Sequence, residues 1–132
     1  MKTGCQIYVK GSVEAVAFYQ RAFNWTIGMN FKNADGTYEH ASLMCRRREM
    51  LAVAEDSNAA TYPELQDGKW PTMAFNCFGL KSREAVDQAY RVLSEGALVH
   101  ATGNPDGPAS VPWCKYCFSL VDKFGINWGV GI

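Results

Sequence analysis

The sequence predicts an α+β fold made of two repeated β-α-β-β-β units, and three observations support it. The first is an internal repeat near the start of each half of the chain. The segment 12–16, Ser-Val-Glu-Ala-Val, returns at 82–86 as Ser-Arg-Glu-Ala-Val, and Arg21 returns as Arg91 at the same separation. Self-similarity that keeps its register along the chain indicates a duplicated supersecondary unit.

The second observation is a later block of the same repeat. Ser42-Leu43 returns as Ser119-Leu120, and Val53 returns as Val130, at a separation that is longer than in the first block. The longer separation requires an insertion in the second copy. The Gly- and Pro-rich segment 103–112 accounts for this insertion.

The third observation is the order of strand and helix periodicity in the first copy. Residues 6–10 alternate apolar and polar side chains, as in a half-buried strand. Ser12 is a favourable N-cap for a helix that extends to about Asn24. Three further strands and the turns between them follow. The strands are expected at 25–31, 38–45 and 49–54, and the turns at 33–36 and 46–48.

The second copy shows the same order of elements. It begins with a strand at 72–78 and a helix at 82–94 that ends before Gly96. The remaining strands are expected at 98–101, 115–121 and 126–130. The prediction is therefore two curved antiparallel sheets around a shared concave cup, with one helix on the outside of each.

We expect one domain, 1–132, whose repeat units occupy about 4–56 and 72–132. A polar linker at about 57–71 joins them. The role of the loop 103–112, as a lid or as a surface excursion, stays open at this stage.

Composition excludes several classes of function. The 13 basic and 13 acidic residues balance, which gives no net field to attract nucleic acid or an anionic membrane. No apolar run approaches the ~20 residues of a membrane span, and the start of the sequence lacks a signal-peptide core. The 5 cysteines, an odd number in apolar contexts, are typical of reduced thiols. We therefore expect a cytoplasmic protein.

Three segments resemble one known superfamily. They are the helix Glu14-Ala15-Val16-x-Phe18-Tyr19, the strand segments 39–43 and 49–51, and the ending Asp122-Lys123-Phe124-Gly125-x-x-Trp128. Together with the paired units they resemble the vicinal-oxygen-chelate superfamily, which includes glyoxalase I, extradiol dioxygenases and bleomycin-resistance proteins. The terminal segment is most similar to the PhnB-like branch.

The resemblance implies a divalent metal held by His, Glu or Gln on the first and last strand of each unit. In the repeat register these positions fall on residues without donor side chains, namely Gly4, Ala52, Ala74 and Gly129. A slip of two residues brings Gln6 and Asn76 to the first-strand positions. The usual metal cage is therefore predicted to be absent. An atypical set of Gln6, His40 and Glu55 stays open, so a divalent metal is not excluded; no other cofactor is predicted.

Aromatic and amide side chains are the candidates to line the cup. We expect planar ligands to stack on the rings and to bond to the amides. The alternative is that the rings fill the core, which we expect for Trp128 beneath the terminal turn. The candidate ligand-binding residues are Gln6, Tyr8, Asn76, Phe78, Trp113 and Tyr116.

The two histidines and one cysteine pair are further candidates for chemistry. His40, on the third strand, is the candidate general acid or base, and His100 is a weaker one. Cys114 and Cys117 have the spacing of redox and zinc pairs. On a strand, however, residues three apart face opposite sides, so no joint site is predicted.

The sequence thus favours a small-molecule-binding protein that lacks the usual metal ligands and sequesters an organic ligand as a homodimer. One alternative is a metal-dependent lyase, isomerase or dioxygenase of the same superfamily. Another is a metal-free enzyme that uses His40 as its acid or base. The chemical identity of the ligand is not specified by the sequence.

Overall fold

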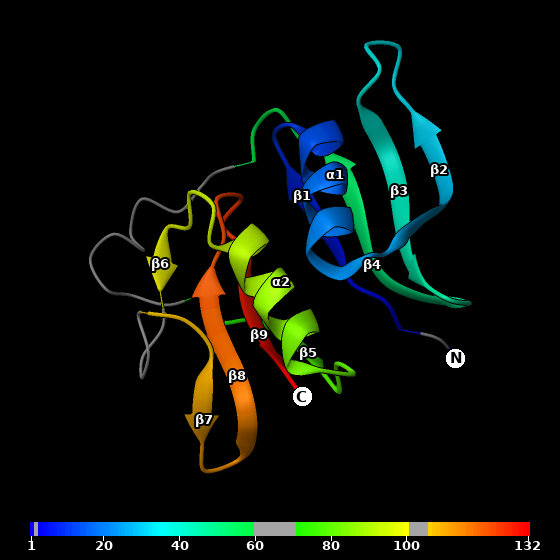
Figure 1. Ribbon diagram of the computed structural model, residues 1–132. Helices are drawn as coiled ribbons and strands as arrows, with labels where there is room; N and C mark the ends of the chain where they lie inside the picture. The colour runs from blue at the N-terminus through cyan, green and yellow to red at the C-terminus, as the bar shows by residue number, and fades with distance from the viewer. Residues whose placement is uncertain (2, 60–70, 101–105) are drawn as a thin grey trace. The chain divides into compact units, whose positions relative to one another are not determined.

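The computed structural model describes residues 1, 3–59, 71–100 and 106–132. The chain divides into two compact units, Met1–Ala60 and Thr61–Ile132. Each unit holds one long helix and one sheet (Figure 1). Most of the predicted linker and the first part of the loop 103–112 lie outside the described residues. No described helix has the length and apolar character needed to cross a bilayer.

The first unit has a four-stranded sheet in the order β1-β4-β3-β2. Its elements are β1 (Gln6–Val9), α1 (Ser12–Phe23), β2 (Thr26–Lys32), β3 (Tyr38–Cys45) and β4 (Arg48–Glu55). The strands β2, β3 and β4 are antiparallel, but β1 pairs with β4 in parallel. The sheet is therefore mixed, where the sequence predicted an antiparallel one. A parallel pair needs a crossover connection, and α1 lies within it.

The second unit repeats this arrangement with one addition. Its elements are β5 (Phe75–Phe78), α2 (Arg83–Leu93), β6 (Val99–His100), β7 (Ala109–Val111), β8 (Cys114–Val121) and β9 (Asn127–Gly131). The sheet order is β5-β9-β8-β6, and β5 and β9 are parallel. The additional strand is β7, which pairs with β8 inside the segment predicted to be loop. Three residues are too few to show an alternating pattern.

The strand register confirms the repeat. In each sheet the first strand, the last strand and the strand beside the last are in register, and one row of the first sheet matches a row of the second. The rows are Gln6–Ala52–Ser42 in the first unit and Asn76–Gly129–Ser119 in the second. Ala52 and Gly129 are thus equivalent, as the sequence predicted.

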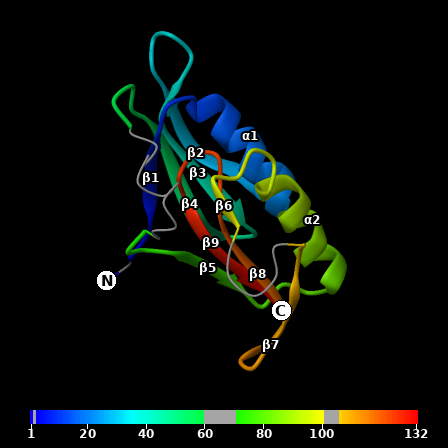
Figure 2. The ribbon, with the colours of Figure 1, turned by 90° about the vertical axis from the view of Figure 1, so that its left-hand side faces the viewer.

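Each helix covers one face of its own sheet (Figure 2). The side chains buried on α1 include Ala15, Phe18 and Tyr19. On β1 the buried Ile7 and Val9 alternate with the exposed Gln6 and Tyr8. The row Gln6–Ala52–Ser42 therefore belongs to the opposite face, which we call the open face of the first sheet.

The start of α1 is capped by a side chain from another strand. The Glu55 carboxylate, at the end of β4, accepts hydrogen bonds from the backbone N–H of Gly11 (2.8 Å) and of Ser12 (3.1 Å). The predicted N-cap Ser12 is one residue inside the helix, and Gly11, with φ of 90°, is the N-cap. The Ser12 hydroxyl instead accepts from the Tyr38 N–H at 2.9 Å, which ties α1 to β3. In α2, Ser82 is the N-cap, and its hydroxyl accepts from the Ala85 N–H.

The turn between β8 and β9 is organised by the buried carboxylate of Asp122. One oxygen accepts from the N–H groups of Phe124 and Ile126, at 2.9 and 3.0 Å. The other accepts from the indole Nε1–H of Trp128 at 2.9 Å. Trp128 therefore packs beneath the terminal turn, as the sequence predicted.

Replacing Glu55 with Ala should lower the free energy of unfolding by about 1–2 kcal/mol, because the N–H groups at the start of α1 lose their acceptor. Denaturant unfolding followed by circular dichroism measures the change. The matched control is Glu39→Ala, an exposed carboxylate on β3, for which we expect a change within about 0.5 kcal/mol. Equal losses in both variants would contradict the capping role.

Candidate functional site

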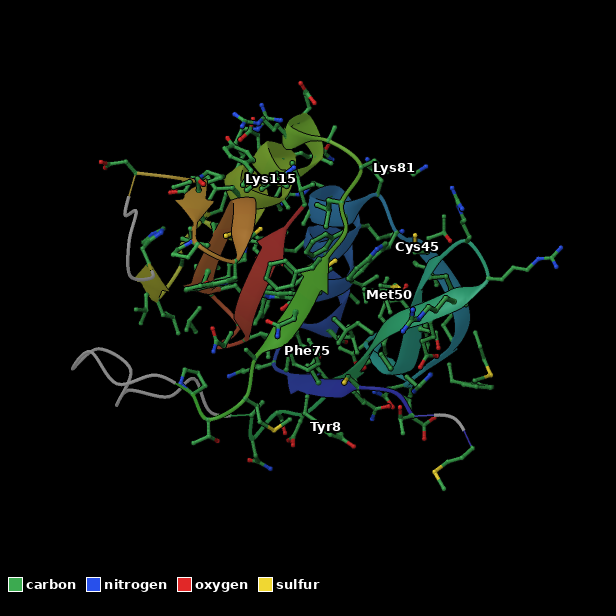
Figure 3. The ribbon with its side chains drawn as sticks, turned by 90° about the horizontal axis from the view of Figure 1, so that it is seen from below. Tyr8, Cys45, Met50, Phe75, Lys81 and Lys115 are labelled. Carbon is green, nitrogen blue, oxygen red and sulfur yellow. The ribbon has the colours of Figure 1, made fainter. Side chains whose placement is uncertain are left out.

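Two aromatic residues stand at the two edges of the open face of the first sheet. Tyr8 on β1 pairs with Ala54 on β4, and Phe31 on β2 pairs with His40 on β3. Tyr8 is 59% exposed and Phe31 56% exposed. Figure 3 labels Tyr8 on its edge strand. Between the edges the β4 side chains are small, since Ala54 is followed in the next row by Ala52. The open face therefore has small side chains along β4, with an exposed aromatic ring on each edge strand.

A chain of hydrogen-bonded polar side chains crosses this face. His40 Nδ1 lies 3.0 Å from Gln6 Oε1, and its Nε2 lies 3.1 Å from Ser42 Oγ. The Ser42 hydroxyl donates to Glu49 Oε2 at 2.5 Å. The chain joins β1, β3 and β4, and it engages both ring nitrogens of His40. Its effect is to hold the imidazole in one orientation between Tyr8 and Phe31.

The direction of these bonds follows from the Glu49 carboxylate. An ionised carboxylate only accepts, so Ser42 donates its proton to Glu49 and its oxygen accepts from His40 Nε2–H. His40 Nδ1 then faces the amide of Gln6, which offers both an acceptor and a donor.

A β-bulge brings Glu49 to the open face. Leu43 pairs with Leu51, but the next residue, Met44, pairs with Glu49, so Met50 is the extra residue. Strict alternation would place Glu49 on the same face as the buried Leu51. A bulge reorients the following side chains, and here it turns Glu49 toward Ser42. Sequence reasoning missed Glu49 because neither a Gly nor a Pro marks this bulge, and with Glu49 it missed the acceptor that gives Ser42 its role.

The open face of the second sheet carries a different set of groups. Asn76 and Phe78, both exposed on β5, lie beside the glycines of β9. A Cβ added to Gly129 would lie 2.6 Å from Asn76 Oδ1, so the Asn76 amide folds over the space that this glycine leaves. A Cβ added to Gly131 would lie 3.0 Å from the Phe78 ring. Asn76 and Phe78 are thus placed together, as are Gln6 and Tyr8 in the first unit.

The other two predicted ligand-binding aromatics lie elsewhere in the second unit. Trp113 is 80% exposed in the turn between β7 and β8. The Tyr116 hydroxyl donates to Asp87 Oδ1 of α2 at 2.5 Å, and the Arg83 guanidinium lies 4.8 Å from the Tyr116 ring centre. Tyr116 therefore faces α2, on the side of the sheet opposite to Asn76 and Phe78.

The residues present do not fit the metal that the superfamily implies. Gly4 and Ala74 precede the strands β1 and β5, and neither they nor Ala52 and Gly129 carry a donor. The atypical set fails as well. Glu55 has both carboxylate oxygens bonded to the start of α1, and it lies outside the His40 chain. Within the described ranges, no group of three His, Cys, Asp or Glu side chains is placed to hold an ion.

Replacing Ser42 with Ala should lower the free energy of unfolding by about 1–3 kcal/mol, because Ser42 is 1% exposed and its loss leaves two polar partners unpaired. The repeat supplies a matched control. Ser119→Ala, at the equivalent but exposed position of β8, should change stability by less than about 0.5 kcal/mol. Chemical denaturation measures the free energy of unfolding of both variants, and equal losses would contradict the hydrogen-bond chain.

The Tyr116–Asp87 hydrogen bond predicts a loss of stability in alkali. Donation to the Asp87 carboxylate, followed by burial, raises the pKa of Tyr116 above its ordinary value of 10.0. A raised pKa in the folded state stabilises the fold fully below pH 10, and this contribution falls as the pH rises further. Tyr116→Phe should therefore cost about 1 kcal/mol at pH 7 and flatten the decline above pH 10. Urea midpoints measured from pH 7 to 11 test this, and parallel curves would refute it.

Comparison with known proteins identifies structures with the same fold. No protein-family model and no curated protein matches the sequence. Among solved structures, a PhnB protein from Bacillus cereus is 18% identical, with a TM-score of 0.75; the match covers 99% of this chain and 98% of that one.

Two other solved structures are also similar over nearly the whole chain. A glyoxylase/bleomycin resistance protein/dioxygenase domain from Frankia is 12% identical with a TM-score of 0.64, and the match covers 100% of this chain and 96% of that one. The fosfomycin resistance protein FosX from Listeria monocytogenes, complexed with Mn(II) and sulfate, is 11% identical with a TM-score of 0.64, covering 99% and 88%. The chain therefore has the vicinal-oxygen-chelate fold, with a PhnB protein among its structural neighbours, as the resemblance in the sequence predicted.

Proposed function

We propose that the protein binds a small planar organic ligand on the open face of its first sheet, without a metal ion. The observation that carries this proposal is the row Tyr8–Ala54, His40–Phe31, in which an oriented imidazole stands between two exposed rings above small side chains. The ligand stacks on Tyr8 and Phe31, packs against the edge of the His40 ring, and forms a hydrogen bond to the amide of Gln6. Sequestration of the ligand requires only this binding surface, without a metal ion or a catalytic group.

The energetics favour this arrangement. An aromatic contact adds about 0.5–1.5 kcal/mol beyond the area that it buries. Binding is weakened when side chains must be ordered on association, and here the hydrogen bonds to Gln6 and Ser42 already hold His40. Glu49, bonded behind Ser42, completes the chain from within the sheet. The polar groups are thus arranged before a ligand arrives.

The metal-dependent alternative is less well supported. A catalytic ion needs about three protein donors that converge and leave open positions. In this chain the carboxylate oxygens of Glu55 accept hydrogen bonds from the start of α1. The two nitrogens of His40 bond to side chains on opposite sides of the ring. The second sheet offers the amide of Asn76 next to Gly129.

The proposal extends to the rest of the predicted lining. Asn76 and Phe78 repeat the amide and the ring of Gln6 and Tyr8 on the second sheet, and they offer a second ligand surface of the same kind. The shared cup, the contribution of Trp113, the homodimer and the cytoplasmic location remain predictions from the sequence.

The test is a binding screen with planar aromatic compounds that carry one polar group, namely phenol, quinoline, benzoate and 2-naphthoate. Ligand-observed NMR finds the binders, and calorimetry measures their Kd. Tyr8→Ala and Phe31→Ala should each raise the Kd of a binder about tenfold. Val13→Ala, an exposed apolar residue on α1, is the matched control and should leave the Kd unchanged. A compound whose Kd is unchanged by both aromatic substitutions would show that the ligand binds elsewhere than on the open face of the first sheet.

The absence of metal is tested separately on the same protein. Elemental analysis comes first, followed by thermal-shift titration with Mn²⁺, Zn²⁺ and Ni²⁺. We expect no stoichiometric metal and no saturable shift. A stoichiometric ion that His40→Ala removes would overturn the metal-free proposal and favour the metal-dependent enzyme instead.

A further inference from the structure

The turn between β7 and β8 brings the thiols of Cys114 and Cys117 together. Cys114 Sγ donates to the carbonyl oxygens of Tyr116 and Ile132, each at 3.6 Å, and it lies together with Cys117 Cβ over Gly131. The sequence expectation of opposite faces is therefore wrong. Cys114 is the first residue of β8, directly after the turn, and the β7–β8 register shifts beside it. Its side chain is not held to strict alternation.

A glycine on the neighbouring strand makes this contact possible. Gly131 on β9 pairs with Cys117. A Cβ added to Gly131 would lie 2.7 Å from Cys117 Cβ and 2.8 Å from Cys114 Sγ, closer than non-bonded atoms approach. The side chains of both cysteines thus converge on the space that a larger residue at position 131 would fill. The convergence depends on the backbone of three strands, β7, β8 and β9.

From this geometry we propose that Cys114 and Cys117 form a dithiol–disulfide site that reacts with low-molecular-weight disulfides such as glutathione disulfide. One protein thiolate attacks a sulfur of the small disulfide and expels one small thiolate, which takes up a proton. The other protein thiol gives up its proton and attacks the mixed disulfide, expelling the second small thiolate. Two protein thiols are oxidised to one disulfide, and the small disulfide is reduced to two thiols.

The surroundings of the pair make this reaction slow at neutral pH. Burial, followed by the hydrogen bond to Cys114, raises the pKa of the Cys117 thiol to about 11. A thiol attacks only as its thiolate, and a thiol with a raised pKa is ionised in only a small fraction of molecules at neutral pH, which slows the step in which Cys117 attacks. Cys5 and Cys45 are exposed and Cys77 is half-buried, and these three are the competing thiols of the chain.

The experiment exploits Lys115, which lies between the two cysteines. The full-length protein is equilibrated with mixtures of glutathione and glutathione disulfide, its free thiols are blocked with N-ethylmaleimide, and it is digested with trypsin. Cleavage after Lys115 separates the peptides 92–115 and 116–123 unless the disulfide joins them. We expect the joined pair by mass spectrometry in most molecules at high glutathione disulfide, and its disappearance on reduction.

Two glycine variants provide the matched comparison. Gly131→Ala inserts a methyl group between the two cysteines and should lower the equilibrium constant for disulfide formation about tenfold, because the overpacked site holds the joined sulfurs less well. Gly129→Ala crowds Asn76 instead and should leave the pair unchanged. Circular dichroism confirms that both variants fold. Cys114→Ser and Cys117→Ser should abolish the joined peptides.

Each other outcome overturns the proposal. Recovery of Cys114 and Cys117 both blocked by maleimide, at every ratio of glutathione to its disulfide, would show that the thiols do not couple. A mixed disulfide of glutathione with either residue, without formation of the Cys114–Cys117 disulfide, would show the same. A disulfide that forms instead with Cys5, Cys45 or Cys77 would place the redox chemistry elsewhere. None of these results depends on ligand binding at the first sheet.

Discussion

The parallel pairing of the first and last strand in each unit is the constraint on which the rest of the structure depends. Because β1 and β4 run in the same direction, the chain between them must cross over, and the helix in that connection covers one face of the sheet. The opposite face is left for other uses. Alternation along β1 then sends Ile7 and Val9 into the core and Gln6 and Tyr8 to the open face. The same pairing of β5 with β9 places Asn76 and Phe78.

Small residues at the centre of each sheet determine what the open face can hold. In the first sheet β4 contributes only Ala52 and Ala54 to the open face, so the taller side chains there are Tyr8 on β1, His40 on β3 and Phe31 on β2. In the second sheet the equivalent strand carries Gly129 and Gly131. The first of these accommodates the Asn76 amide, and the second accommodates the two thiols. Two copies of one backbone have thus acquired different chemistry from substitutions at the same few positions.

The sequence predicted features that depend on local periodicity or on the repeat, and it missed those that depend on contacts between strands. The order of the elements, the equivalence of Ala52 and Gly129 and the position of Trp128 followed from pattern alone. The cap of α1 did not, because Glu55 reaches it from the end of another strand. The place of Glu49 depends on a bulge without a sequence mark. The convergence of the thiols depends on where β8 begins, which is a boundary of one residue.

The bulge at Glu49 also explains how side chains of metal-ligand type serve another purpose in this chain. Gln6, His40 and Glu49 are an amide, an imidazole and a carboxylate, the donor types that the superfamily uses for its ion. Here Gln6 bonds to His40, and Glu49 is linked to His40 through Ser42. The three groups are therefore hydrogen-bonded in a line, and they do not converge on one point as metal ligands do. A line of bonds fixes the orientation of His40 and leaves the edge of its ring toward the face. Orientation of one imidazole between two rings is what a binding site for a planar molecule requires, and an ion would have to break that line to bind.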